Sequence, residues 1–391
     1  MKKLQMKKLF AILLALVMVM GIAACGNDDY YDIAPEQTEE PVVETALPGA
    51  GGNFIGLILP TTDTDRWMRD DYYFRQAAAG TGMRIEVLFS GNSVQTEREN
   101  VERLVELGAD VIILAAVDSF AAASAAEQAH SAGVPVIAYE RLIKGTRAVD
   151  FYVTACYIQI GVAMAQHLEN NATGQGNPLY IFTGDADDNN AFLLFEGAWS
   201  VLQPRIADGT FFIANSTDAV ALQDRITLTR EEMTKIVQQV STNWSHSVAR
   251  DLAETQLAGK SSEFKGEVFV LAPNDATALS ISDAFHMDPE ITSIFITGLG
   301  AEIGSIRAII DGRQTMTVFR KIPDLVAVTM EVVRDIFDGR RPTGETTFHN
   351  EVLEVPANIV SVVTIERHNV IEHIIDPGVF DRELFDLTGL E

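Results

Sequence analysis

Short apolar runs alternate with longer stretches of helical periodicity from residue 53 onward. In the first part of the chain the apolar runs span 54–59, 85–89, 111–115 and 134–139. Helical patterns fill the intervals, at 67–79, around Val101 and Leu104, and near 120–130. This alternation predicts βαβ units with a parallel sheet, and uninterrupted apolar strands suit a sheet that helices cover on both faces.

The pattern restarts at 151–154 and continues with apolar runs at 179–182, 211–214, 268–271, 294–297 and 316–319. Helical patterns accompany these runs at 162–168, at 191–202 and along a polar stretch from about 229 to 257. The predicted fold class is therefore α/β, with two Rossmann-like doubly wound lobes. Two such lobes that face each other place their loops across one cleft, and small ligands bind outside the carboxyl ends of parallel strands.

The first 25 residues have the pattern of an export signal. Four lysines precede an apolar run at 9–22, and the segment ends in Ile22-Ala23-Ala24-Cys25. A transmembrane helix needs about 20 apolar residues, and this run is shorter. The last four residues look like a bacterial lipobox, so we expect residues 1–24 to be a lipoprotein signal peptide and Cys25 to be lipidated. The protein is then expected in the cell envelope, anchored by lipid on the extracytoplasmic side of the membrane, in the periplasm or at the cell surface.

Residues 25–52 are predicted to form a disordered acidic tether. They hold seven acids, three prolines and no basic residue, and they end in a Gly-rich stretch. Such a composition buries too little apolar surface to offset the entropy of ordering the chain. A coil of this length reaches about 30 Å root-mean-square, which would hold a folded domain away from a membrane surface.

Composition narrows the functional class. The 391 residues carry a formal charge of −26, and 47% of them are hydrophobic. The apolar share supports a sizeable core and the length favours two domains, whereas nucleic-acid binding requires a basic footprint that this chain lacks. The sequence holds no phosphate loop, dinucleotide fingerprint, nucleophile elbow or zinc-protease motif. We therefore predict a binding protein with no catalytic residues, no cofactor, no metal and no nucleic-acid partner.

One spacing imitates a calcium-binding loop. Asp185, Asp187, Asn189 and Glu196 fall at ligand positions of that motif, but Asn190 stands where the loop requires glycine. N-capping of the helix that follows explains the acids and asparagines at this place better.

Polar and aromatic side chains follow several of the predicted strands. These loops span 60–67, 117–119, 139–142, 183–191 and 272–276. Sugar hydroxyls both donate and accept hydrogen bonds, and Asp, Asn and Arg offer them fixed, often bidentate partners. An aromatic ring such as that of Trp67 can pack on the C–H face of a pyranose. Helix capping or surface pairing would explain any one of these residues, but five loops at equivalent strand ends favour a ligand site.

Five stretches carry a resemblance to a known family: Asp65-Arg66-Trp67, VPVIAYERLI at 134–143, DDNNA at 187–191, NDATA at 274–278 and QTMTVF at 314–319. In these stretches residues 54–391 resemble the periplasmic sugar-binding proteins of type I, the soluble receptors of ABC importers, and chiefly their xylose-binding and multiple-sugar-binding branch. The resemblance implies two lobes joined by a three-strand hinge. On that pattern we expect an N-terminal lobe at 53–145 with 320–346, and a C-terminal lobe at 146–319 with 347–391.

The resemblance also implies which residues hold the ligand. Carried over position by position, these ligand-binding residues are Arg66, Trp67, Asp118, Glu140, Arg141, Asn189, Asn190, Asp275 and Arg320. Glu140 stands where the branch usually has aspartate, and Arg320 stands where it usually has lysine.

Other positions depart from the pattern of the branch. Ala155-Cys156-Tyr157 replaces a usual Phe-Asp-Asn, and Gly298-Leu299-Gly300-Ala301 replaces a usual Gly-Gln-Asp-Ala. Polar sugar contacts are thus exchanged for Cys156, Tyr157 and Gly300, and each lost buried hydrogen bond costs about 1–3 kcal/mol. These residues predict an altered pocket, which takes a modified sugar-like ligand or binds weakly unless Tyr157 or Arg320 compensates.

Together these features predict an extracytoplasmic solute-binding lipoprotein. It would capture a sugar or sugar-like small molecule in a cleft between two lobes by hinge closure, and deliver it to the membrane permease of an ABC importer. The alternative is a ligand-sensing partner of a membrane receptor kinase, with an altered or weakened pocket. We expect a monomer that meets the membrane only through its lipid.

Overall fold

The computed structural model of the chain describes residues 53–390. The predicted signal peptide at 1–24, the lipid on Cys25 and the tether at 25–52 lie outside these residues. Within the described range, every helix is too short or too polar to span a bilayer.

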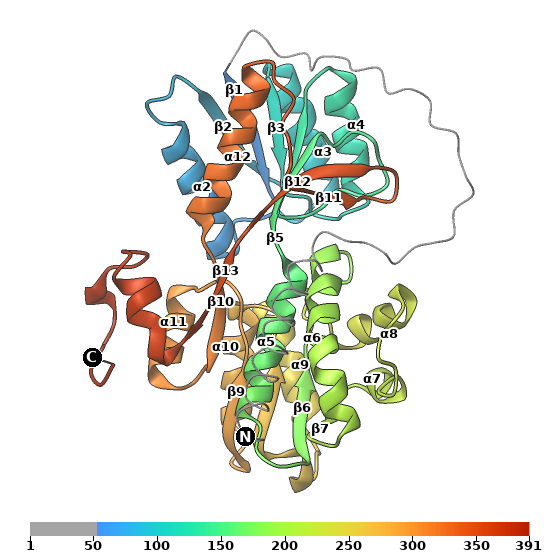
Figure 1. Ribbon diagram of the computed structural model, residues 1–391, viewed down its shortest axis with the longest axis vertical. Helices are drawn as coiled ribbons and strands as arrows, with labels where there is room; N and C mark the ends of the chain where they lie inside the picture. Colours follow the sequence, from blue (N-terminus) through green and yellow to red (C-terminus); the bar gives the residue numbers. More distant parts are fainter. Residues whose placement is uncertain (1–52, 391) are drawn as a thin grey trace, which may run out of the picture.

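Two α/β lobes lie one above the other, joined by strands that pass between them (Figure 1). The first lobe is built on a seven-stranded sheet with the order β11-β12-β5-β4-β3-β1-β2, in which only the pairing of β11 with β12 is antiparallel. Its elements are β1 (Phe54–Leu59), α2 (Asp65–Ala78), β2 (Arg84–Phe89), α3 (Val94–Glu106), β3 (Val111–Leu114), α4 (Ala122–Ser131), β4 (Val136–Tyr139), β5 (Phe151–Ala155), α12 (Ile322–Phe337), β11 (Thr346–His349) and β12 (Glu354–Val360).

Strand β1 illustrates why the first sheet is apolar on both faces. All six of its residues are buried. Ile55 and Leu57 pack with α2 and α12 on one face, while Phe54 and Ile58 pack with α3 and α4 on the other. Successive side chains of a strand point to opposite faces, so a strand covered by helices on both sides appears in the sequence as a continuous apolar run.

The second lobe contains a parallel four-stranded sheet with the order β7-β6-β8-β9 and an antiparallel pair, β10 and β13. Its elements are α5 (Tyr157–Asn171), β6 (Asn177–Ile181), α6 (Asn189–Ala207), β7 (Phe211–Ile213), α7 (Thr217–Ala221), α8 (Arg230–Val240), α9 (His246–Leu257), β8 (Gly266–Leu271), α10 (Asp275–His286), β9 (Ile291–Ile296), α11 (Ile303–Asp311), β10 (Met316–Arg320) and β13 (Val362–Glu366). The lobe also contains short 3₁₀ helices at η1 (Ser262–Phe264), η2 (Arg367–Asn369) and η4 (Arg382–Leu384), and a short π-helix at η3 (Ile371–Ile375).

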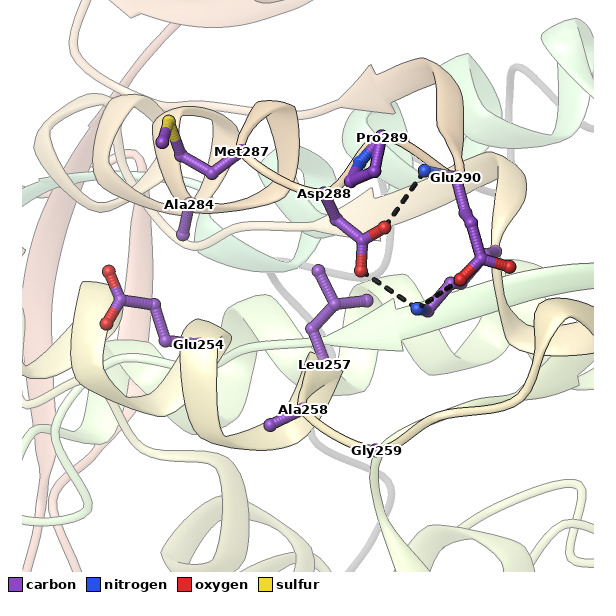
Figure 2. A pocket seen from close by; sticks show the side chains of 10 residues that line it. Glu254, Leu257, Ala258, Gly259, Ala284, Met287, Asp288, Pro289 and Glu290 are labelled. Atoms are coloured by element: carbon purple, nitrogen blue, oxygen red, sulfur yellow. Dashed lines mark hydrogen bonds and ion pairs between the residues drawn. The ribbon is translucent and has the colours of Figure 1, made fainter.

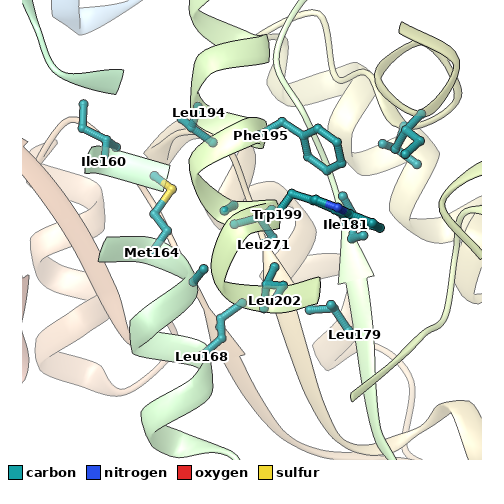
Figure 3. Close-up of a cluster of buried hydrophobic side chains, with 14 of the residues drawn as sticks. Ile160, Met164, Leu168, Leu179, Ile181, Leu194, Phe195, Trp199, Leu202 and Leu271 are labelled. Atoms are coloured by element: carbon teal, nitrogen blue, oxygen red, sulfur yellow. The ribbon is translucent and has the colours of Figure 1, made fainter. Parts of the chain in front are cut away.

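Helices α5 and α6 pack closely together on one face of the second sheet and supply most of the labelled side chains of the apolar cluster in Figure 3. Glycines make this approach possible. A Cβ atom on Gly161 would lie 2.8 Å from the backbone nitrogen of Ala198 and closer still to the carbonyl oxygen of Leu194. A Cβ on Gly197 would meet the backbone of Ile158 in the same way. Backbone cannot yield as a flexible side chain can, so both positions require glycine.

Replacing Gly161 with Ala is expected to lower the free energy of unfolding by about 1–3 kcal/mol, because the added methyl forces the two helices apart. Gly304→Ala is the matched control, since its Cβ would meet only a terminal methyl of Leu279, at 3.3 Å. Denaturant unfolding of both variants measures the difference. Equal unfolding midpoints would contradict the close helix crossing.

The chain passes between the lobes three times: from β5 to α5, from β10 to α12 and from β12 to β13. The sheets divide the chain at different residues from those expected. Strands β5, β11 and β12 belong to the first sheet, although 146–319 and 347–391 were expected in the second lobe. The sequence pattern restarts at residue 151, but β5 pairs with β4, with Ile137 opposite Phe151. Strand pairing, rather than the rhythm of apolar runs, therefore sets the boundary.

The polar stretch at 229–257 also differs from its prediction, which was one continuous helical pattern. It forms two helices, α8 and α9, separated by a turn at 241–245. Helix α8 ends at Val240, where Ser241 already has an extended backbone, and Asn243 and Trp244 then have left-handed φ values of 51° and 55° that no helix adopts. The break brings the Trp244 ring to the space between the lobes.

Candidate ligand-binding site

A cavity of about 80 Å³ lies between the lobes, with room for several water molecules. Its walls come from the carboxyl ends of strands in both lobes, where parallel sheets bind ligands. The first lobe contributes Thr64, Arg66, Trp67, Glu140 and Arg141. The second lobe contributes Tyr157, Asp188, Trp244, Asn274, Leu299, Gly300, Glu302 and Arg320.

Arg66 is fixed on α2 by two carboxylates. Its Nε donates to Asp70 Oδ2 at 2.6 Å, one helical turn away, and its Nη2 lies 2.8 Å from Glu140 Oε1. Asp70 also accepts a hydrogen bond from the hydroxyl of Tyr139. Burial alone would lower the pKa of the Arg66 guanidinium, but Asp70 and Glu140 outweigh it and raise that pKa well above its ordinary value. Arg66 therefore presents a fixed positive charge to the cavity.

Glu140 is the centre of the site. It has a φ of +65°, and its backbone carbonyl accepts hydrogen bonds from Tyr152, Thr154 and Asn190, which hold that strained conformation. Its carboxylate oxygen Oε2 accepts from the Tyr157 hydroxyl at 2.7 Å and from Arg320 Nη1 at 2.9 Å. Arg320 Nη1 also donates to the Tyr157 hydroxyl oxygen.

The charge state of Glu140 follows from these contacts. Burial raises the pKa of the carboxyl group, but Arg320 and Arg66, together with the Tyr157 hydrogen bond, outweigh burial and lower that pKa to about 2. The carboxylate is thus ionised at any physiological pH. It holds two arginines and one tyrosine in place around the cavity.

The two lobes touch each other beside the cavity. Arg141 Nε of the first lobe lies 3.0 Å from Asp188 Oδ2 of the second, while Arg141 Nη1 donates to the carbonyl of Ala116 at 2.8 Å. Asn190 Nδ2 of the second lobe donates to the Glu140 carbonyl at 2.8 Å. These contacts close the cleft over the cavity.

Several buried polar atoms at the cavity lack a hydrogen-bond partner among the described residues. They are Thr64 Oγ1, Trp244 Nε1 and Arg320 Nε, all on cavity-lining residues, and Asn190 Oδ1 nearby. Buried polar atoms are nearly always satisfied, so a cluster of exceptions points to a ligand or to ordered water. Two of these atoms can only donate, one can only accept and the hydroxyl can do both.

Aromatic rings and matched charges complete the lining. The guanidinium carbons of Arg66 and Arg141 lie 4.8 Å and 5.7 Å from the centre of the Trp67 ring. The rings of Trp67, Tyr157 and Trp244 all border the cavity. Its three arginines are matched by three carboxylates, and each arginine is ion-paired with an acid of the site.

The structure brings together about half of the residues that the sequence predicted to bind ligand. Arg66, Trp67, Glu140, Arg141 and Arg320 line the cavity, as do Tyr157 and Gly300 among the departures. Asp118, Asn189, Asn190, Asp275 and Cys156 are not among the lining residues.

The predicted residues that do not line the cavity have other contacts. Asp118 Oδ1 accepts hydrogen bonds from the backbone nitrogens of Phe120 and Ala121, at 2.8 and 2.5 Å, just before α4. Asn189 Oδ1 accepts from Arg230 at 2.9 Å. Cys156 is buried at the start of α5.

Asp275 supports the cavity from behind. Its side chain is buried, and it accepts hydrogen bonds from the backbone nitrogen of Glu302 at 2.9 Å and from Gln314 Nε2 at 3.1 Å. Burial raises the pKa of the Asp275 carboxyl group above its ordinary value, although these hydrogen bonds oppose the rise. Gly300 in the supported loop has a φ of +136°, which favours glycine.

The residues that line the cavity without having been predicted are Thr64, Asp188, Trp244, Asn274, Leu299 and Glu302. Asp188 and Asn274 cap α6 and α10 and lie within stretches that carry the family resemblance. Trp244 lies inside the stretch interpreted as one helix. Ser245, whose side chain accepts from Val248 N, was the available signal, because serine is a preferred residue at a new helix start.

A larger hollow of about 420 Å³ lies at the outer end of the second lobe, between the ends of α9 and α10 (Figure 2). Its cation, Lys265, is held at 2.9 Å by both Asp288 and Glu290. The hollow is wide open, and Lys265, Asp288 and Glu290 pair with one another while Glu254 pairs with Arg250 on its own helix. The smaller cavity between the lobes is therefore the better candidate for ligand binding.

Comparison with known proteins agrees with this geometry. The family described as periplasmic binding protein domain matches residues 55–341. The multiple sugar-binding periplasmic receptor ChvE of Rhizobium radiobacter is 26% identical over 336 residues, covering 83% of this chain and 90% of that protein. The D-xylose-binding periplasmic protein of Escherichia coli (strain K12) is 24% identical over 324 residues, with 83% and 90% covered.

A solved relative is more similar still. The crystal structure of a carbohydrate transporter solute binding protein from Chloroflexus aurantiacus, in complex with D-glucose, is 48% identical in sequence. Its TM-score against this chain is 0.84, and the match covers 86% of this chain and 98% of that one.

Proposed function

Because the chain belongs to the periplasmic binding protein family, we propose that it is a receptor that captures a neutral monosaccharide between its lobes and delivers it to the permease of an ABC importer. This membership confirms the predicted family resemblance, the two-lobed α/β fold and the expectation of a binding protein rather than an enzyme. It also agrees with an extracytoplasmic location. The lipid expected on Cys25 would hold the receptor near its membrane partner.

The unpartnered polar atoms of the cavity are the observation that carries the proposal. Thr64 Oγ1, Trp244 Nε1 and Arg320 Nε are buried beside aromatic rings and lack partners among the described residues. A sugar satisfies such a mixture, because each hydroxyl both donates and accepts while the ring C–H groups pack on aromatic faces. Tyr157, one of the departures from the family pattern, supplies a hydroxyl to the Glu140 and Arg320 contacts and so compensates for a lost polar group.

The charge pattern favours an uncharged ligand. Arg66 and Arg320 pair with Glu140, and Arg141 pairs with Asp188. An anionic ligand would have to displace one of these carboxylates or meet its repulsion, and an uncompensated buried charge is costly. The contacts over the cavity, Arg141 with Asp188 and Asn190 with Glu140, restrict the ligand to a small molecule.

Capture follows from the contribution of both lobes to one cavity. A ligand that touches both lobes binds the closed arrangement more tightly than an open one, so it shifts the population toward closure. In the closed arrangement Arg141 meets Asp188 and Asn190 meets the Glu140 carbonyl, which adds protein contacts to those made by the ligand. The closed outer surface is then what a permease would recognise.

Isothermal titration calorimetry with D-glucose, D-xylose, D-glucuronate and glucose 6-phosphate tests the proposal. We expect a neutral sugar to bind with micromolar or tighter affinity, and the anionic derivatives to bind at least tenfold more weakly. Tighter binding of an anion would contradict the charge argument. A folded protein that binds none of the four would instead favour the altered pocket expected from Cys156, Tyr157 and Gly300. Native mass spectrometry of protein from its source would then identify the modified ligand.

A further inference from the structure

The turn that carries Trp244 is unusual in its backbone. Two consecutive residues, Asn243 and Trp244, occupy the left-handed region, which bulky L-residues rarely adopt. The loop that follows β6 holds the turn in place. Thr242 Oγ1 donates to the carbonyl of Thr183 at 2.8 Å, and Ser241 Oγ donates to the carbonyl of Gly184 at 2.8 Å. A strained conformation that is fixed at several points indicates that the position of the Trp244 ring matters.

Gly184 lies directly beneath this ring. A Cβ atom on Gly184 would lie 2.5 Å from Cη2 of the Trp244 indole, and closer still to Cζ2 and Cε2. The φ of Gly184 is outside the left-handed region, so its backbone would accept alanine. The three atoms nearest to such a Cβ all belong to the indole ring, so the ring excludes a side chain at position 184.

The Trp244 indole ring, which packs on Gly184, has one polar atom that is buried and can donate a hydrogen bond. Trp244 borders the cavity, and its Nε1 is buried without a partner among the described residues. The indole atom Cε2, which a methyl group at 184 would displace, is covalently bonded to Nε1. We propose that Gly184 is a positioning residue, which sets ligand affinity by seating the Trp244 indole with its Nε1–H available to a ligand oxygen. This inference rests on the proposed capture of a sugar in the cavity.

A merely structural role for Gly184 makes different predictions. If the glycine only allowed the lobe to fold, alanine would lower stability and would weaken binding equally whether or not the indole were present. If it seats the indole, the effect on affinity disappears once the indole is replaced. Gly184→Ala, Trp244→Phe and the double variant separate these two roles, and Gly304→Ala is the control for adding a methyl where it fits.

The experiment combines ¹⁹F NMR of protein labelled with 5-fluorotryptophan and calorimetry with D-glucose. The chain has three tryptophans, so Trp244→Phe assigns the Trp244 resonance by its loss. In ligand-free protein, Gly184→Ala is expected to shift that resonance and to leave those of Trp67 and Trp199 in place. In the parent protein, Gly184→Ala should weaken glucose binding at least tenfold. In the Trp244→Phe protein, the same substitution should weaken glucose binding by less than twofold. Gly304→Ala should alter neither signal nor affinity.

An unshifted Trp244 resonance, or equal losses of affinity in the two backgrounds, would overturn the proposal. If Gly184→Ala fails to fold while the double variant folds, the clash with the indole is established directly. Failure of the parent protein to bind glucose or another neutral sugar would instead contradict the proposed function. In that case the proposed role of Gly184 in ligand affinity would also be wrong. The NMR shift of the ligand-free protein would still show whether Gly184 positions the Trp244 ring.

Discussion

Replacing Glu140 with Gln is expected to lower the free energy of unfolding by about 3 kcal/mol and to weaken sugar binding at least 100-fold. The substitution keeps the shape of the side chain but removes the charge that faces Arg66 at 2.8 Å and Arg320 at 2.9 Å. Removing one partner from a buried ion pair leaves the other charge uncompensated in a poor solvent. Arg66 keeps its pairing with Asp70 at 2.6 Å, so the uncompensated charge falls mainly on Arg320, and the loss is that of one buried pair.

Denaturant unfolding and calorimetry measure the two effects. Glu231→Gln is the matched control, because its side chain is 83% exposed and pairs with Lys235 one turn away. Exposed pairs of this kind contribute about 0.2–1 kcal/mol, so the control should remain near the parent protein. Similar losses in the two variants would mean that Glu140 is not the centre of the site.

The pH dependence of the same variant adds an independent check. The pKa of Glu140 is about 2 in the folded protein, below its ordinary value of 4.5. A lowered pKa stabilises the fold fully above the ordinary value, and this contribution disappears as the pH falls from about 4.5 through about 2. The difference in unfolding free energy between parent and Glu140→Gln should therefore shrink across that acidic window. A constant difference would exclude the ionised carboxylate as its source.

The parts of the fold that could be predicted from the sequence are those in which burial is complete. Strands β1, β3 and β4 of the first sheet are buried at every residue, so their apolar runs are uninterrupted. Strand β11 has alternating intermediate and exposed residues, and β12 mixes buried and open positions. Such strands have no continuous apolar run, and their place in the first sheet depends on pairing that sequence rhythm does not encode.

The candidate site divides in a similar way. Arg66, Trp67 and Arg141 belong to stretches that carry the family resemblance, and they line the cavity. Asp118 lies in an equivalent loop, but its carboxylate accepts local backbone hydrogen bonds instead. Aspartate can stabilise a turn as well as bind a ligand, so the residue type and its position after a strand did not distinguish these two roles. Trp244 was missed because its turn interrupts a polar helical pattern that continues on either side.

Replacing Arg141 with Met is expected to weaken sugar binding about 100-fold while changing the unfolding free energy of the ligand-free protein by less than about 1 kcal/mol. Arg141 and Asp188 lie on different lobes, and both side chains are nearly buried in the closed arrangement. In an open arrangement water can reach both groups. The cost of an unpaired Asp188, about 3 kcal/mol, then falls on closure rather than on folding. This separates Arg141 from Arg66, which lies on the same lobe as its partner Glu140.

Small-angle X-ray scattering and calorimetry test this assignment to closure. At saturating sugar the parent protein should become more compact, and Arg141→Met should need about 100-fold more sugar for the same change. Arg205→Met is the control, since Arg205 is 43% exposed and pairs with Glu169 and Asp208 inside one lobe.

A second substitution, at Asp188, tests the same explanation directly. Burial raises the pKa of the Asp188 carboxyl group, and Arg141 opposes that rise. Without Arg141 the buried carboxylate is the main obstacle to closure. Arg141→Met combined with Asp188→Asn should therefore bind sugar more tightly than Arg141→Met alone, because no charge remains to be buried when the lobes meet. If the double variant binds more weakly than either single one, Asp188 holds the sugar directly and the contact with Arg141 is not the one that drives closure.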